Sequence, residues 1–120
     1  RMQKPPRIFH VNWFRQNEAG EYLWPGYGEN LRVLKWIIDR CHGKIQARET
    51  PIGYVPYEND FDLTGLDLTP AVMRELFRVD QEVWQEEWRA QGEFFKKFGD
   101  DLPEELRREH RALGERVKAE

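Results

Sequence analysis

The residues best suited to binding chemistry are four aromatic side chains near the N-terminus and one amide that follows them. The aromatic residues are Phe14, Tyr22, Trp24 and Tyr27. An aromatic face stacks on a planar base for about 1 to 3 kcal/mol, without distinguishing one base from another. Selectivity needs a polar group, and Asn30 offers a carbonyl acceptor and NH2 donors, which match an edge of mixed polarity such as that of guanine. This combination predicts a pocket for a flat ligand.

The same stretch, EYLWPGYGEN, also fits a packed loop that binds nothing. On this interpretation the aromatic side chains are core, Pro25 shapes a tight turn, and Asn30 caps the helix that follows. Gly26 and Gly28 suit both cases, because glycine adopts conformations that other residues resist and lets the backbone come close to a neighbour. The pattern leaves the packed loop and the pocket both open.

The side-chain combinations that usually perform catalysis are missing from this sequence. It has no serine, which removes a Ser-His-Asp triad, and GYGEN has too few glycines for a phosphate loop and no lysine after them. His10, His42 and His110 fall in three separate segments, so no metal-ligand spacing arises. Cys41 falls on the apolar face of a predicted helix, which indicates a buried thiol. We expect no catalytic residue and no metal ligand, so the chain alone should be inactive.

Composition limits the class of protein. A chain of 120 residues is long enough for a single core, and 39% hydrophobic with 34% charged residues is typical of globular domains. The formal net charge of −3 predicts no nucleic-acid partner and no anionic membrane partner. A single cysteine and the lack of a basic and then apolar leader favour a cytoplasmic protein. The start RMQKPPR predicts a linker over residues 1–6, as at a domain boundary of a longer protein.

The first predicted element carries one arm of the pocket. The segment from Arg7 to Phe14 places bulky side chains on both of its faces, which predicts an interior strand. Asn17 and Gly20 favour a reversal, after which residues 22–24 return as a short antiparallel strand. We therefore expect a β-hairpin, followed by the irregular loop that completes the pocket.

Helices are expected in much of the remaining chain. A helix is expected within residues 30–43, with Asn30 as its N-cap and Gly43 just past its end. Its apolar side chains at helical spacing are Leu34, Ile37, Ile38 and Cys41. Residues 44–65 contain glycine and proline breakers, so they should be extended and packed on a larger body. Thr69 followed by Pro70 begins a short helix in the favoured order, a cap and then proline at the first helical position.

Two longer helices are expected at the C-terminal end. From Asp80 to Phe98 the aromatic residues recur at helical offsets, while the Glu and Gln residues between them face water. A last helix follows Pro103 and is almost entirely charged outside a narrow apolar stripe. An alternative role for this region is docking on a partner protein, through Trp84, Trp88 and Phe95.

Four segments, in the same order and at similar spacing, resemble the C-terminal part of GTP-dependent phosphoenolpyruvate carboxykinase. They are IFHVNWFR, YLWPGYGEN, RVLKWI and TPIGYVP. The resemblance is strong from Arg7 to Leu68 and fades over the final helices. It implies a mixed α/β fold with an N-terminal β-hairpin and a guanine-binding loop, followed by mostly helical segments. Residues 7–68 would be the guanine-binding part of the nucleotide-binding domain, and residues 69–120 the C-terminal helices.

The resemblance also implies which residues meet the guanine base. They are Phe14, Tyr22, Tyr27, Gly28, Glu29 and Asn30. The three aromatic rings would surround the base, and Asn30 would hydrogen-bond its edge. The backbone of Gly28 and Glu29 would lie beside the base.

Two tryptophans and two tyrosines complete this implied pocket. Trp13 and Trp24 would support it from behind. Tyr22 and Tyr27 stand where well-known members of the family have phenylalanine, which keeps the stacking face and adds hydroxyls that need a partner or water. This difference bears on the polarity of the pocket and on nucleotide affinity.

The activity implied by the resemblance is a lyase reaction, the decarboxylation that starts gluconeogenesis. Oxaloacetate and GTP become phosphoenolpyruvate, carbon dioxide and GDP, with Mn2+ or Mg2+ as the metal. The family's metal ligands, phosphate-binding loop, reactive cysteine and mobile lid lie N-terminal to this region, in a part of the enzyme that would be the partner of this chain. Cys41 therefore does not take the role of the reactive cysteine. The alternative is a non-catalytic module that stacks sugars or single-stranded bases on the same aromatic residues.

Overall fold

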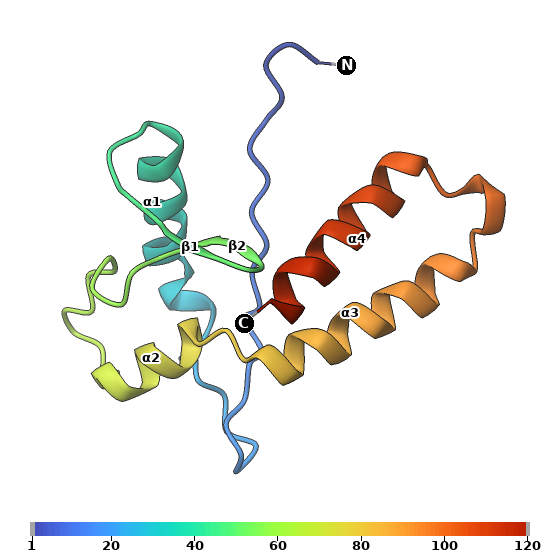
Figure 1. Ribbon diagram of the computed structural model, residues 1–120. Coiled ribbons are helices and arrows are strands. Elements are labelled where there is room, and N and C mark those ends of the chain that lie inside the picture. The colour runs from blue at the N-terminus through green and yellow to red at the C-terminus, as the bar shows by residue number, and fades with distance from the viewer. Residues whose placement is uncertain (1, 120) are drawn as a thin grey trace. The chain divides into compact units, whose positions relative to one another are not determined.

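The computed structural model describes residues 2–119, and Figure 1 labels their main helices and strands. These residues form two compact units. One unit contains residues 2–48 and 55–78, and the other contains residues 49–54 and 79–119. The elements in chain order are η1 (Tyr27–Glu29), α1 (Asn30–Cys41), β1 (Arg48–Thr50), β2 (Gly53–Val55), α2 (Pro70–Phe77), α3 (Gln81–Lys96), η2 (Gly99–Asp101) and α4 (Glu104–Lys118). β1 and β2 form a two-stranded sheet. The predicted mixed α/β class is thus confirmed in its coarse form.

The core of the first unit is built around Trp36 of α1, Met73 of α2 and Phe61 from the loop between β2 and α2. Met73 is 1% exposed. The Trp36 ring lies 6.5 Å from that of Phe61, and Phe9 meets it edge-on at 6.2 Å. The indole Nε1 of Trp36 donates a hydrogen bond to Oδ2 of Asp60 at 3.0 Å. This core anchors α1, the helix that carries the candidate site.

The N-terminal segment does not form the interior strand expected over residues 7–14. A strand needs a neighbour that exchanges backbone hydrogen bonds with it, and in the described part of the chain this arm has only the isolated antiparallel bridge of Gln16 with Tyr22. The reversal itself is confirmed, because Oδ1 of Asn17 accepts two backbone N–H groups at 2.9 Å and Gly20 has a φ of 78°. The expected β-hairpin is reduced to a turn with one bridge.

α1 confirms the predicted helix but not its predicted cap. The helix ends at Cys41, and Gly43 with a φ of 70° follows it. Asn30 is the first helical residue, and Glu29 at the N-cap position makes no side-chain cap hydrogen bond. The 3-10 turn η1 brings the chain into helical conformation one turn earlier, so Asn30 lacks the extended backbone that a capping side chain needs. The prediction that Asn30 caps α1 is therefore wrong.

The exposed position of Cys41 shows that the prediction of a buried thiol is also wrong. α1 carries two apolar stripes, and the one with Trp36 and Ile37 packs in the core. Cys41 lies on the other stripe with Leu34 and Ile38, both of which are exposed. Helical spacing identifies both stripes but does not say which of them the core covers.

The predicted start signal of α2 is confirmed, and α3 begins with a cap of the same kind. Oγ1 of Thr69 accepts the backbone N–H of Val72 at 3.3 Å, and Pro70 stands in the first turn of α2. Asp80 caps α3 in the same way, because its Oδ1 accepts the backbone N–H of Val83 at 3.1 Å. In both helices a short polar side chain satisfies an N–H group that the helix itself leaves unpaired.

In the second unit α3 and α4 pack together through His110. Its ring stacks on Trp88 at 5.0 Å with the planes 10° apart, and Phe95 meets it edge-on at 5.5 Å. The Trp88 indole N–H donates to the His110 carbonyl at 2.8 Å, and Nε2 of His110 donates to the Trp88 carbonyl at the same distance. These contacts place two of the three residues suggested for partner docking, Trp88 and Phe95, against α4.

The two ends of this helical hairpin are joined by hydrogen bonds. Gln81 and Gln85 of α3 both donate their side-chain amides to the carbonyl of Val117, each at 3.2 Å. Val117 is itself buried. Near the turn between the helices, Arg107 donates to the carbonyl of Gly99. α3 and α4 are therefore connected at the turn and again where α3 begins and α4 ends.

Candidate functional site

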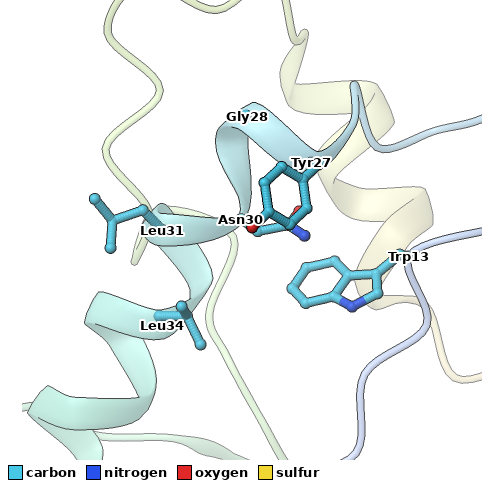
Figure 2. Close-up of a pocket in the computed structure, with 6 residues that line it drawn as sticks. All are labelled: Trp13, Tyr27, Gly28, Asn30, Leu31 and Leu34. Atoms are coloured by element: carbon cyan, nitrogen blue, oxygen red, sulfur yellow. The ribbon is translucent and has the colours of Figure 1, made fainter.

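A hollow of about 370 Å³ lies at the N-terminal end of α1 (Figure 2). The residues that line it are Trp13, Tyr27, Gly28, Asn30, Leu31 and Leu34. One comes from the arm before the turn, two from η1 and three from the first turns of α1. Small-molecule pockets measure about 300 to 1,000 Å³ and combine apolar walls with a few polar groups. This hollow is at the lower end of that range and has that character.

Two aromatic rings flank the amide of Asn30 in this hollow. Figure 2 draws the Asn30 side chain between the rings of Tyr27 and Trp13. Tyr27 is 92% exposed, so both faces of its ring are accessible and at least one can stack on a ligand. The predicted pocket residues Trp13, Tyr27, Gly28 and Asn30 are therefore brought together.

The side chain of Asn30 is held by Trp24. Nε1 of Trp24 donates to Oδ1 of Asn30 at 2.8 Å. Trp24 is only 6% exposed, and its ring lies 6.3 Å from that of Trp13 with the planes 41° apart. Trp24 thus contacts two residues of the hollow without being part of its lining.

Phe14 and Tyr22 lie outside the hollow. Their rings meet edge-on at 6.3 Å, and they are 75% and 62% exposed. They stand on the two arms of the turn that the Gln16 bridge to Tyr22 closes. The structure pairs these two predicted residues with each other, on an exposed arm separate from the hollow lining.

Glu29 directs its carboxylate to a neighbouring arginine. Its Oε2 lies 2.7 Å from Nε of Arg32, which also donates to the carbonyls of Asp62 and of Thr64, the latter at 2.9 Å. The Asp62 carboxylate accepts the backbone N–H of Thr64 at 2.9 Å, and hydrogen bonding from the Thr64 side chain and backbone lowers the pKa of Asp62. Arg32 therefore ties η1 to the loop that precedes α2, and the Glu29 side chain shapes the site without lining it.

One of the two glycines expected to need special backbone freedom does need it. Gly26 has φ 137° and ψ −174°, a conformation that side-chain-bearing residues rarely adopt. Gly28 lies within η1 and is not among the described residues with positive φ, and a Cβ added there would meet nothing within 4 Å. The expected backbone conformation that only glycine adopts readily is therefore present at Gly26 and absent at Gly28.

Leu31 and Leu34 are the lining residues that the sequence reasoning missed. Both are exposed, and they continue along α1 from Tyr27 at offsets of four and three residues. This is helical spacing, so the signal was present in the sequence. This spacing places Leu31 and Leu34 on one stripe with Tyr27, the candidate for stacking on a ligand. The stripe lies on a different side of α1 from the residues that pack in the core.

Comparison with known proteins identifies the family. The family model described as "Phosphoenolpyruvate carboxykinase C-terminal P-loop domain" matches residues 1–116. The chain is 53% identical over 115 residues to "Phosphoenolpyruvate carboxykinase [GTP]" of Arthrobacter sp. (strain FB24), covering 96% of this chain and 19% of that protein. It is 45% identical over 119 residues to the protein of the same name from Anaeromyxobacter sp. (strain K), covering 99% and 20%.

A vertebrate relative is similar to the same extent. The chain is 46% identical over 116 residues to "Phosphoenolpyruvate carboxykinase, cytosolic [GTP]" of Gallus gallus, covering 96% of this chain and 18% of that protein. The chain thus spans about a fifth of the length of the curated relatives it matches. The match extends well past residue 68, where the resemblance of the motifs began to fade, and includes the final helices. The chain belongs to the family of the phosphoenolpyruvate carboxykinase C-terminal P-loop domain.

Proposed function

We propose that this chain supplies the guanine-recognition pocket of a GTP-dependent phosphoenolpyruvate carboxykinase. The whole enzyme would convert oxaloacetate and GTP to phosphoenolpyruvate, carbon dioxide and GDP, as a step of gluconeogenesis. The observation that carries the proposal is the meeting of Tyr27, Trp13 and Asn30 at one hollow, in a chain whose relatives are named as GTP enzymes. A flat aromatic face and an amide beside it are the two groups that base recognition needs.

Each residue of the pocket has a distinct role in this proposal. Tyr27 stacks on the base, and the amide of Asn30 hydrogen-bonds its edge. Phe14 and Tyr22, which already contact each other, provide a second aromatic wall from the neighbouring arm. The backbone of η1 at Gly28 runs beside the base. Stacking on Tyr27 contributes about 1 to 3 kcal/mol to binding of any base. The preference for one base over another therefore depends on Asn30.

The chemistry of the reaction belongs, in this proposal, to the part of the enzyme that precedes this region. Among residues 2–119 there is no group of three or more His, Cys, Asp or Glu side chains that could hold a metal ion. The residues present therefore do not fit the Mn2+ or Mg2+ that the family's reaction uses, and we assign those ligands, the GTP phosphates and oxaloacetate to the preceding part.

The proposed location is the cytoplasm. The Gallus gallus relative is named as a cytosolic protein. Separately, none of the helices formed by residues 2–119 is long and apolar enough to cross a membrane.

Asn30→Ala in the whole carboxykinase should raise KM for GTP about 10- to 30-fold and leave KM for oxaloacetate within about twofold. The substitution removes the pocket's amide, and a ligand polar group left without a partner in a site costs about 1 to 3 kcal/mol. Steady-state kinetics with each substrate varied in turn measures both constants.

Asn59→Ala is the matched control, since Asn59 is an exposed asparagine in a turn of the same unit. It should leave both constants at the wild-type values. An Asn30→Ala enzyme with unchanged KM for GTP, or one that loses oxaloacetate and GTP affinity equally, would show that this hollow does not recognise the base.

A further inference from the structure

The hydrogen bond between Trp24 and Asn30 fixes which way the Asn30 amide points. A carboxamide has an oxygen that accepts and an NH2 group that donates, and the two ends are similar in shape. The indole Nε1 of tryptophan can only donate. With 2.8 Å between that nitrogen and the amide, the atom facing Trp24 is Oδ1 of Asn30.

The reversed orientation is disfavoured because Trp24 is buried. Turning the amide over would place its NH2 group against the indole N–H, so two donors would face each other. Trp24 is 6% exposed and packs against Trp13, so the indole would have little access to water as a substitute partner. Burial of the donor therefore locks the amide in one orientation.

This orientation limits what Asn30 can offer a ligand. In the described part of the chain its side chain makes one hydrogen bond, the one that uses Oδ1. The NH2 group is left for the hollow, where Figure 2 draws the amide between the rings of Tyr27 and Trp13. A group that presents N–H donors forms a hydrogen bond with a base edge that carries an acceptor. It cannot form one with a base edge that carries another donor, so binding of that base is weaker.

We propose that Trp24 is a positioning residue that makes the pocket select 6-oxopurines over 6-aminopurines. Guanine carries a carbonyl oxygen at position 6, which accepts from the Asn30 NH2 group. An amino group at the same position would meet the NH2 group donor to donor, and Asn30 cannot adapt by turning over while Trp24 holds its oxygen. This inference rests on the proposed function and adds the residue that sets its selectivity.

The test is Trp24→Phe in the whole carboxykinase, because phenylalanine keeps an aromatic ring and removes the N–H group. The measured quantity is the ratio of kcat/KM for GTP to kcat/KM for 2,6-diaminopurine riboside triphosphate. These nucleotides share the 2-amino group and differ at position 6 and at the adjacent N1, which carries a hydrogen in guanine and none in 2,6-diaminopurine. We expect the ratio to fall about tenfold in Trp24→Phe. A ratio taken on one enzyme preparation does not depend on the fraction of enzyme that is folded.

Trp13→Phe is the matched control, since Trp13 is a tryptophan that lines the hollow and packs against Trp24. Among the described residues, the Asn30 oxygen accepts its hydrogen bond from Trp24 and not from Trp13. It should change both kcat/KM values together and leave their ratio at the wild-type value. In the double variant Trp24→Phe with Asn30→Ala, the ratio should equal that of Asn30→Ala alone, because Trp24 acts through Asn30.

Two results would count against these ideas, and they are distinguishable. If Asn30→Ala lowers the ratio and Trp24→Phe leaves it unchanged, the positioning role of Trp24 is overturned while the guanine pocket stands. If neither substitution changes the ratio, the assignment of base recognition to Asn30 fails as well.

Discussion

Replacing Trp36 by alanine should lower the free energy of unfolding of the chain by about 3 to 5 kcal/mol, the usual cost of removing a buried large aromatic side chain. Trp36 is central to the core of its unit, where it contacts Phe61 and Phe9. Its loss would also leave the Asp60 carboxylate without the indole donor at 3.0 Å. Urea unfolding followed by far-UV circular dichroism measures the change.

Trp36→Phe separates the two contributions. Phenylalanine keeps most of the ring packing and cannot donate to Asp60, so it should cost about 1 to 2 kcal/mol, less than half the effect of alanine. Exposed Leu31→Ala on the same helix serves as the control and should change stability by less than about 0.5 kcal/mol. Equal effects of Trp36→Phe and Trp36→Ala would mean that the hydrogen bond, and not the packing, is what Trp36 contributes.

Gly114→Ala should destabilise the chain by about 2 kcal/mol, although alanine favours helix by about 1 kcal/mol over glycine. A Cβ at Gly114 would lie 2.6 Å from Cε2 of Trp88, closer than packed carbon atoms approach. The indole cannot move aside easily, because it donates to the carbonyl of His110, stacks on its ring and lies under the ammonium of Lys118 at 4.3 Å. Overpacking of this kind costs about 1 to 3 kcal/mol. Urea unfolding again measures it.

Gly92→Ala is the matched control for Gly114→Ala. It brings the same gain in helix propensity, but its Cβ would approach its neighbour less closely, at 3.2 Å from Cε1 and 3.7 Å from Nε2 of His110. We expect a change within about 0.5 kcal/mol of zero. A Gly114→Ala chain as stable as the wild type would contradict the close approach of Trp88 to α4.

The helices of this protein were predictable where a local signal decides the structure. Thr69 with Pro70 acts within one turn of its own position, as does Gly43, and they mark the start of α2 and the end of α1 as expected. Capping depends on a side chain and the backbone groups three residues away, so it can be inferred without knowing the rest of the fold.

The predictions for residues 7–14 and for Cys41 failed because they depended on what lies across from the residue, and the prediction for Asn30 failed because of the turn before it. Residues 7–14 have the alternation of a strand, but pairing requires a neighbour that the pattern does not name. Cys41 lies on one of two apolar stripes of α1, and only the packing of Trp36 decides which stripe is buried. Asn30 fits the composition of a cap, and the 3-10 turn before it removes the capping geometry.

The kinds of residue in the candidate site were predictable from the sequence, but only some of the residues that line it were. Tyr27 and Asn30 are close in sequence and on one helical turn, so their meeting follows from the helix. Phe14 and Tyr22 are joined to them only through the turn, whose geometry the sequence does not specify. Their roles in binding guanine stay predictions. The Trp24 hydrogen bond could not be foreseen, because it depends on the orientation of a single amide.

The two glutamines that share the carbonyl of Val117 have a consequence for how the second unit opens. The bonds from Gln81 and Gln85 fasten the last turn of α4 to the first turns of α3. The C-terminal turn of a helix normally frays, and its amide protons exchange with solvent far sooner than those of the interior. Here fraying would also release buried Val117. We therefore expect the terminal turn of α4 to exchange its amide protons together with the middle of both helices, as one cooperative unit.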